Sequence, residues 1–423
     1  MHRKNIANGV AESFFKSDKF KTTSISVSFY LKPTAQTVAA NALAGAMMAS
    51  STLKYSDTVS LKRYLDTLYG AVLNNSVRKN GDYQEINLTL SVLDDAPGDS
   101  GCLFSAAVRL LNDMIFERYF NEVDYPIEIL EREKRLQAEE TLGMINDKRL
   151  FSRQRCEEEL CRQEPFGLPV LGTVDQIEAI DAKALKSAIK SIIETAYISV
   201  RIIGKRFYDD AFTVFEDNFK RVKRNFSGTD GDIIKPAGTV KTITEKFDVT
   251  QGKLVLGLRS DKVGTDETTI PTVVMADIFG GGPHSKLFLN VREKQSLCYY
   301  CSARPVRRKG IMLVESGVEG KNILKAKEEI LKQFNQVKDG CFTQEDLDTS
   351  IRSLCVGIRM VEDDLTALDF WYSSRFDEQT PLTPKQYIEK LKQVTRQQVI
   401  DAARGFEPDT VYILEPTEDT ANA

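Results

Sequence analysis

Apolar and polar residues alternate along several short stretches of the chain, which is the pattern of a β-strand that buries one face. In residues 22–32 the apolar positions are Ile25, Val27, Phe29 and Leu31, and Pro33 follows them. Proline cannot donate a hydrogen bond to a neighbouring strand, so the strand should end there. We therefore predict a half-buried strand over 22–32. Similar patterns predict strands over 71–79, 83–93 and 196–204.

Apolar residues at helical spacing predict the helices between these strands. In the first half of the chain we expect helices over 36–51, 60–69, 100–117, 126–162 and 176–194, and one that ends near 226. The first is almost entirely small and apolar, so both of its faces should be covered. The longest begins near Pro126, and proline is tolerated at a helix start. Asp94–Asp99 is rich in turn-forming residues and is expected to form a turn.

The second half of the chain repeats this order of elements. Strands are predicted over 253–259, 297–305, 310–317 and 410–414, and helices over 270–279, 285–293, 322–338, from about 343, and 383–403. We therefore predict an α+β fold of two homologous domains, each a mostly antiparallel sheet with helices packed on one face. The predicted boundaries are 1–226 for the N-terminal domain, 227–240 for a polar, glycine-rich linker and 241–423 for the C-terminal domain.

Composition excludes several classes of function. The formal net charge is only −4 over 423 residues, so the chain lacks the basic surplus of a nucleic-acid-binding domain. No stretch reaches the ~18 consecutive apolar residues of a membrane span, and the N-terminal residues show no apolar core of a secretory signal. Seven cysteines without regular spacing fit a reducing compartment. We expect a cytoplasmic protein with no nucleic-acid or membrane partner.

Histidine and cysteine chemistry has few candidates, because His2 and His284 are the two histidines of the sequence. His2 lies at a terminus that is expected to fray. His284 precedes Ser285, but adjacent residues rarely form a nucleophile–base pair, so a turn or helix cap is expected there. Cys298 and Cys301 have C-x-x-C spacing. On a strand, residues i and i+3 face opposite sides, so two buried free thiols are expected rather than a redox or metal pair.

Four short motifs follow one another in the second half: Gly280-Gly281-Gly282, Ser285–Phe288, Val291–Lys294 and Leu297-Cys298-Tyr299. Together they resemble the C-terminal half of pitrilysin/insulinase-type zinc metallopeptidases. In that family a glycine-rich turn precedes a helix ending in Arg-Glu-Lys and a strand opened by an aromatic residue. Pro165–Thr173 is similar to the family's segment after the long helix of the first half. The resemblance covers essentially the whole chain and implies a processing-peptidase-like architecture.

The zinc-binding motif of that family is missing from this chain. Catalytic members carry His-x-x-Glu-His on their first helix, where two histidines bind zinc and the glutamate activates water. The matching positions here are Ala42, Gly45 and Ala46, and a third, downstream ligand would fall at about Glu140. One carboxylate cannot replace the three protein ligands of a catalytic zinc site. We therefore expect no metal, no catalytic residue and no peptidase activity in this chain alone.

The resemblance extends to bacterial heterodimers in which only one subunit holds zinc. It implies that this chain is the other, non-catalytic subunit, paired with a homologous zinc-binding chain that carries His-x-x-Glu-His. In such pairs the zinc-free subunit holds the peptide substrate through an Arg and a Tyr, which match Arg292 and Tyr299. Both side chains can donate to a peptide carbonyl or to its oxyanion. The turn formed by Gly280, Gly281 and Gly282 adds backbone that is free to contact a peptide, and a homodimer is also possible.

Other interpretations of these residues stay open at this point. Arg292 and Tyr299 could simply fill a strand–helix junction, and Tyr300 competes with Tyr299 because a shift of one residue exchanges the faces of a strand. The glycine turn could hold a phosphate, but no Gly-Lys-Ser/Thr sequence follows it. The alternative function is a scaffold or accessory protein in a peptide or translation-factor modification pathway, without proteolysis.

Overall fold

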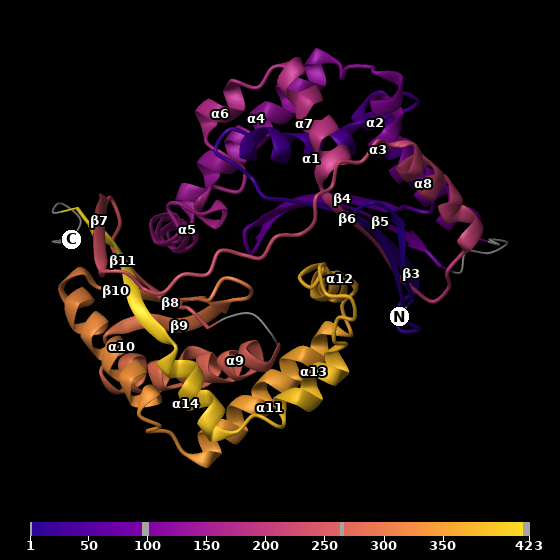
Figure 1. Ribbon diagram of the computed structural model, residues 1–423. Coiled ribbons are helices and arrows are strands. Elements are labelled where there is room, and N and C mark those ends of the chain that lie inside the picture. Colours follow the sequence, from indigo (N-terminus) through magenta and orange to yellow (C-terminus); the bar gives the residue numbers. More distant parts are fainter. Residues whose placement is uncertain (1, 95–100, 263–265, 418–423) are drawn as a thin grey trace. The chain divides into compact units, whose positions relative to one another are not determined.

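The computed structural model describes residues 2–94, 101–262 and 266–417, which form two compact units (Figure 1). Unit 1 comprises Met1–Leu142, Leu168–Gly231 and Val361–Pro381, and unit 2 comprises Gly143–Gly167, Asp232–Met360 and Leu382–Ala423. Each half of the chain thus contributes one short segment to the unit built mainly from the other half. The predicted domain boundaries, 1–226 and 241–423, do not include this exchange of segments between the two halves of the chain. The domain boundaries stay a prediction.

Unit 1 is built on a six-stranded sheet, within the described residues, in the order β1-β2-β6-β3-β5-β4. The strands are β1 (His2–Ala7), β2 (Val10–Lys16), β3 (Thr22–Leu31), β4 (Val72–Asn80), β5 (Tyr83–Leu93) and β6 (Tyr197–Gly204). β2 and β6 are parallel and the other pairs are antiparallel. The helices are α1 (Val38–Ser50), α2 (Thr58–Thr67), α3 (Cys102–Asn121), α4 (Ile127–Gly143), α6 (Val174–Glu178), α7 (Ala182–Thr195), α8 (Asp209–Arg221) and α12 (Leu365–Ser373).

The two faces of this sheet are covered in different ways. Ile25, Val27 and Phe29 of β3 point into an apolar core shared with α1, α3, α7 and α8. The alternating polar side chains Ser28 and Tyr30 point to the other face, where α12 packs against β3 and β6 (Figure 1). The predicted alternation in β3 is correct, but the strand is not half-buried, because a helix from the C-terminal half of the chain covers its polar face.

Unit 2 contains a five-stranded sheet, among the described residues, in the order β7-β11-β8-β10-β9. The strands are β7 (Lys241–Phe247), β8 (Gly252–Ser260), β9 (Cys298–Val306), β10 (Ile311–Val318) and β11 (Phe406–Pro416). β7 and β11 are parallel and the other pairs are antiparallel. The helices are α5 (Lys148–Leu160), α9 (Asp266–Gly280), α10 (Ile323–Lys338), α11 (Gln344–Val361), α13 (Pro384–Leu391) and α14 (Arg396–Arg404), and Leu287–Lys294 is a π-helix. Short 3₁₀ turns lie at Met144–Asn146, Pro165–Gly167 and Gly320–Asn322.

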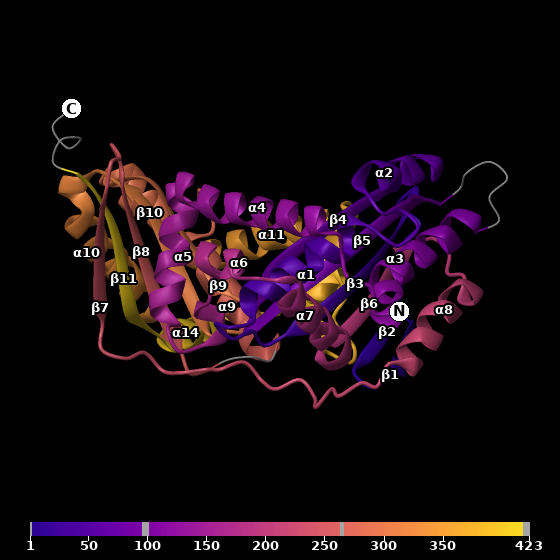
Figure 2. The same ribbon diagram turned by 90° about the horizontal axis from the view of Figure 1, so that it is seen from above.

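In unit 2, α5 occupies the place that α12 has in unit 1. Cys156 and Leu160 of α5 pack with Val255, Leu313 and Tyr412 of the sheet in one buried cluster. α9, α10 and α14 pack elsewhere on the sheet, against β9, β8 and β11, and Figures 1 and 2 show them on the side opposite α5. The predicted α+β class with mostly antiparallel sheets and helices packed on one face is confirmed. Each sheet carries in addition one helix from the other half of the chain on its second face.

A buried ion cluster fixes the turn that follows α5. The carboxylate of Glu164 accepts a hydrogen bond from Lys309 Nζ at 2.7 Å and another from Arg259 Nη2 at 2.7 Å. All three side chains are almost completely buried. The cluster therefore ties the 143–167 segment to β8 and to the β9–β10 hairpin.

Several predicted elements need correction. The single helix over 126–162 is wrong: α4 ends at Gly143, and α5 begins after Asp147, whose carboxylate accepts from the backbone N–H groups of Arg149 and Leu150 at 3.0 Å. Such an N-cap starts a new helix because it satisfies otherwise unpaired N–H groups. The predicted helices over 176–194 and 383–403 are likewise each divided in two, by the N-caps Asp181 and Thr395.

Other elements were not predicted at all. No strand or helix was predicted where β1, β2, β7 and α12 lie. His2 does not fray, because it pairs with Phe14 across β1 and β2. The expected turn at Asp94–Asp99 falls, after Asp94, outside the described residues.

Candidate functional site

The helix that corresponds to the zinc helix is α1, and it is packed without room for ligand side chains. Ala42 is buried. A Cβ atom added at Gly45 would lie 2.5 Å from Cγ2 of Ile86 and 3.1 Å from Oδ1 of Asn75. α1 therefore lies directly on β4 and β5, at a distance that a glutamate at position 45 would not allow. Ala46 is half-buried and carries only a methyl group.

Amide side chains, rather than carboxylates, surround the beginning of α1. Gln137 of α4 donates to the carbonyl oxygens of Ala39 at 3.1 Å and Leu171 at 2.7 Å. Gln84 of β5 donates to the carbonyl oxygen of Val38 at 2.9 Å. Glu140 is exposed, so the α4 side chain that reaches α1 is the neutral Gln137. Among the described residues no cluster of three or more His, Cys, Asp or Glu side chains could hold a metal ion.

Arg292 and Tyr299 lie close together along the chain at the open edge of the second sheet. β9 is the last strand in the described order of that sheet, so it pairs only with β10. Tyr299 near its start is 59% exposed. Arg292 belongs to the preceding π-helix, a form found often at functional sites. Its side chain is 41% exposed, and its Nε lies 3.5 Å from the carboxylate of the exposed Glu293.

A β-bulge sets the direction of Tyr299. Val318 of β10 pairs with Cys298 while the adjacent Gly317 pairs with Tyr300, so Tyr299 is an extra residue without a partner in the ladder. Bulges of this kind re-aim a side chain and recur next to active sites. Tyr300 packs instead over Gly317, where an added Cβ would lie 2.5 Å from its ring. The Arg149 guanidinium lies 4.4 Å from the centre of the Tyr300 ring, and burial raises the pKa of this phenol.

The same bulge changes the relation between the two cysteines of the C-x-x-C sequence. Cys298 and Cys301 pair with Val318 and Ser316, which are two residues apart on β10 and therefore share a face. The expectation that the two thiols face opposite sides is wrong, because it ignored the extra residue. A hydrogen bond from the Cys301 thiol lowers the pKa of Cys298 to about 7. Both cysteines are free thiols, as expected.

The glycine turn is largely used for packing. A Cβ at Gly280 would lie 2.6 Å from the backbone N of Ala303, and one at Gly281 would lie 2.3 Å from Oδ2 of Asp277. Gly282 has more space, since its nearest neighbour is His284 at 3.4 Å. Gly280 thus allows α9 to approach β9, and Gly281 leaves room for the Asp277 side chain of α9.

His284 fixes this turn rather than relaying a proton. Its Nε2 lies 2.7 Å from Oδ1 of Asp277 and 3.1 Å from Oγ of Ser350. A general base in a catalytic triad contacts its acid and its nucleophile through different ring nitrogens, whereas here one nitrogen contacts both. Ser285 accepts from the backbone N–H of Phe288 at 3.3 Å, as expected for a helix cap.

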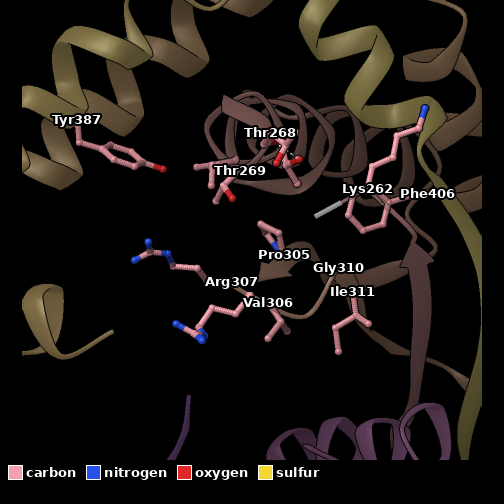
Figure 3. Close-up of a pocket in the computed structure, with 13 residues that line it drawn as sticks. Lys262, Thr268, Thr269, Pro305, Val306, Arg307, Gly310, Ile311, Tyr387 and Phe406 are labelled. Carbon is pink, nitrogen blue, oxygen red and sulfur yellow. Dashed lines mark hydrogen bonds between the residues drawn. The ribbon is translucent and has the colours of Figure 1, made fainter. Parts of the chain in front are cut away.

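A small hollow in unit 2 lies away from these residues (Figure 3). It is lined by Thr268 and Thr269 of α9, by Pro305 and Val306 of β9 and by Tyr387 of α13. Its volume of about 90 Å³ is far below the ~300 Å³ at which pockets begin to accept small ligands. It is therefore not a candidate substrate site.

Comparisons with known proteins support the class that the fold and the altered zinc helix suggest. Residues 179–354 match the family model described as the peptidase M16 inactive domain. This match agrees with the resemblance to zinc metallopeptidases, whose metal ligands this chain replaces by Ala42, Gly45 and Ala46. It is similar to the probable inactive metalloprotease YmfF of Bacillus subtilis (strain 168), with 27% identity over 416 residues that cover 98% of each chain.

Solved structures agree on the fold. A conserved protein from Enterococcus faecalis V583 superposes with a TM-score of 0.89 at 24% identity, covering 98% of both chains. A peptidase M16 inactive domain from Pseudomonas fluorescens superposes with a TM-score of 0.78 at 16% identity, again over 98% of both chains. Within the described part of the chain, no helix is long and apolar enough to cross a membrane.

Proposed function

We propose that this chain is the non-catalytic subunit of a heterodimeric peptidase. In this proposal a homologous partner with His-x-x-Glu-His supplies the zinc ion, and this chain binds the peptide substrate and completes the partner's active site. The seven cysteines form no disulfide within the described residues, which supports a reducing compartment, and we place the protein in the cytoplasm. The basis of the proposal is the similarity to the peptidase M16 inactive domain, together with the lack of His-x-x-Glu-His in α1.

The observation that carries the proposal is the exposure of Tyr299 and Arg292 beside an edge strand. An extended peptide can add to such an edge through main-chain hydrogen bonds. The phenol O–H of Tyr299 and the guanidinium of Arg292 are then placed to donate to a peptide carbonyl, and to the oxyanion that forms when water attacks it. Tyr300 is a poorer candidate because its ring is packed over Gly317 and against Arg149.

Pairing and cleavage test this proposal. The chain would be co-expressed with a homologous protein of similar length that carries His-x-x-Glu-His, and the two would be purified through a tag on one of them. We expect a stable one-to-one pair that cleaves unstructured peptides only when both chains and zinc are present. Cleavage by this chain alone, after removal of contaminating peptidase, would contradict the proposal.

Two other outcomes have defined meanings. A stable pair whose partner cleaves equally well alone would point to a scaffold or accessory role without a part in proteolysis. A self-associated chain that excludes the partner would point to a homodimer and would end the proposed division of labour.

A further inference from the structure

Unit 1 contains a cavity that the proposed function does not use. It lies between the C-terminal end of α3, the loop that follows it, α7 and the end of α8, and its volume is about 430 Å³. This is within the ~300–1,000 Å³ range of small-molecule pockets. Its apolar lining includes Phe120, Leu130, Leu185 and Ile189. Apolar walls of this size favour a ligand with a hydrocarbon body.

One wall of the cavity carries a buried arginine that has no carboxylate partner in the described part of the chain. Arg118 is only 9% exposed, and its guanidinium donates to the carbonyl oxygens of Asp124 at 3.0 Å and Thr52 at 3.3 Å and to Ser51 Oγ at 3.4 Å. All three acceptors are neutral. Its Nε has no hydrogen-bond partner among the described residues. A buried cation without a counter-charge is costly, so a ligand anion nearby would be favourable.

The other charged residues of the lining also leave the cavity with a net positive charge. Five cationic side chains line the cavity against three acidic ones, and the cationic ones besides Arg118 are Lys186, Lys190, Arg221 and Lys223. Of the acids, Asp124 already lies 3.3 Å from Lys186, and Glu194 accepts from Tyr119 at 2.8 Å and lies 4.0 Å from Lys190. The lining therefore keeps an excess of positive charge beside an apolar interior.

We propose that this cavity binds a small amphipathic carboxylate. The hydrocarbon part packs against Phe120, Leu185 and Ile189, and the carboxylate lies on the cationic side, near Arg118 and Lys186. Neither a fully apolar ligand nor an amphipathic cation satisfies both halves of the cavity. The proposal does not depend on peptide binding at β9.

Binding of decanoate below its micellar concentration tests the proposal, with decanol and decyltrimethylammonium as matched probes of equal chain length. Isothermal titration should show decanoate binding at one site, at least ten-fold more tightly than decanol, and no binding of the cation. Hydrogen exchange should show slower exchange in 118–130 and 182–194 when decanoate is bound. Equal affinity for decanoate and decanol, or protection confined to other segments, would overturn the proposal.

Variants separate the two halves of the site. Ile189→Trp fills the apolar interior and should abolish decanoate binding. Lys186→Glu, which reverses a charge of the lining, should weaken binding at least ten-fold. Lys183→Glu, at an exposed lysine of the same helix that is not among the lining residues, should leave binding unchanged. Lys186→Glu keeps the proposal falsifiable if Ile189→Trp fails to fold, because undiminished binding by a folded Lys186→Glu protein contradicts the assigned charge contact.

Discussion

The ion pair between Arg201 and Asp369 should contribute much of the free energy that holds α12 on the sheet of unit 1. Arg201 donates from Nε and Nη2 to the two carboxylate oxygens of Asp369, at 2.9 Å and 3.0 Å. The two side chains are 2% and 8% exposed. Asp369→Ala leaves the guanidinium buried with the neutral groups Ser28 and Tyr30 as its hydrogen-bond partners. Removing one partner of a buried pair costs about 3–5 kcal/mol. We expect a loss of about 3 kcal/mol, because Glu85 on β5, two strands away, supplies part of the missing negative charge.

Urea denaturation followed by circular dichroism measures this loss, and hydrogen exchange locates it. The 361–381 segment should exchange faster than in the wild type, before the rest of unit 1. The double variant Arg201→Met/Asp369→Leu should recover most of the lost stability, since a buried ion pair can be replaced by packed apolar residues at little cost. Glu389→Ala, which removes an exposed pair with Lys392, is the control and should change nothing measurable. A loss below ~1 kcal/mol for Asp369→Ala would refute the reasoning, since that is the range of an exposed pair.

Three further predictions follow from the structure. Gly45→Glu should lower the melting temperature in a thermal scan, because a Cβ at this position has no room. It should not create zinc affinity in a zinc titration. The Cys298 thiolate absorbance near 240 nm should appear with a midpoint at about pH 7, since the hydrogen bond from Cys301 lowers the pKa of Cys298 from 9.0. The stability that this hydrogen bond adds is then complete above pH 9 and is lost as the pH falls through 7. A titration midpoint near pH 9 would contradict the lowered pKa. Glu164→Gln should cost roughly 3 kcal/mol, because it removes the buried carboxylate that Lys309 and Arg259 share. Desolvation raises the pKa of Glu164, but Lys309 and Arg259 outweigh this effect and hold the pKa below 4.5. In the wild type the stability that this ion cluster contributes is therefore present above pH 4.5. It is lost only as the pH falls through the lowered pKa.

Local pattern predicted most strands and helices because periodicity reports directly which face is buried. β3 and β5 follow from alternation alone, and α1 follows from its small apolar residues. The break between α4 and α5 also had a local signal, since Gly143 and the N-cap Asp147 stand at its two ends, but a long amphipathic pattern outweighed it. β1, β2 and β7 are short or rich in charged residues, so their pairing depends on partners distant in the sequence.

The candidate site could be predicted only in part, because its geometry depends on register. The motif identified Arg292 and Tyr299, and the structure places both at an exposed edge. The β-bulge at Tyr299 depends on how β9 pairs with β10, which no local pattern contains. The same bulge explains why Cys298 and Cys301 share a face. Glu140 was singled out as the match to the family's third zinc ligand. The α4 side chain that hydrogen-bonds to α1 is instead Gln137, whose amide gives no metal-binding signal in the sequence.

The most direct measurement of the central claim is kcat/KM for peptide cleavage by the reconstituted pair, with this chain as wild type, Tyr299→Phe or Tyr300→Phe. Each variant removes a single phenol oxygen and leaves the ring in place. If Tyr299 donates to the developing oxyanion, its loss should reduce kcat/KM by about 10²–10³-fold, with the pair still assembled and Tyr300→Phe close to wild type. Equal cleavage by all three pairs would contradict the claim that this chain completes its partner's active site.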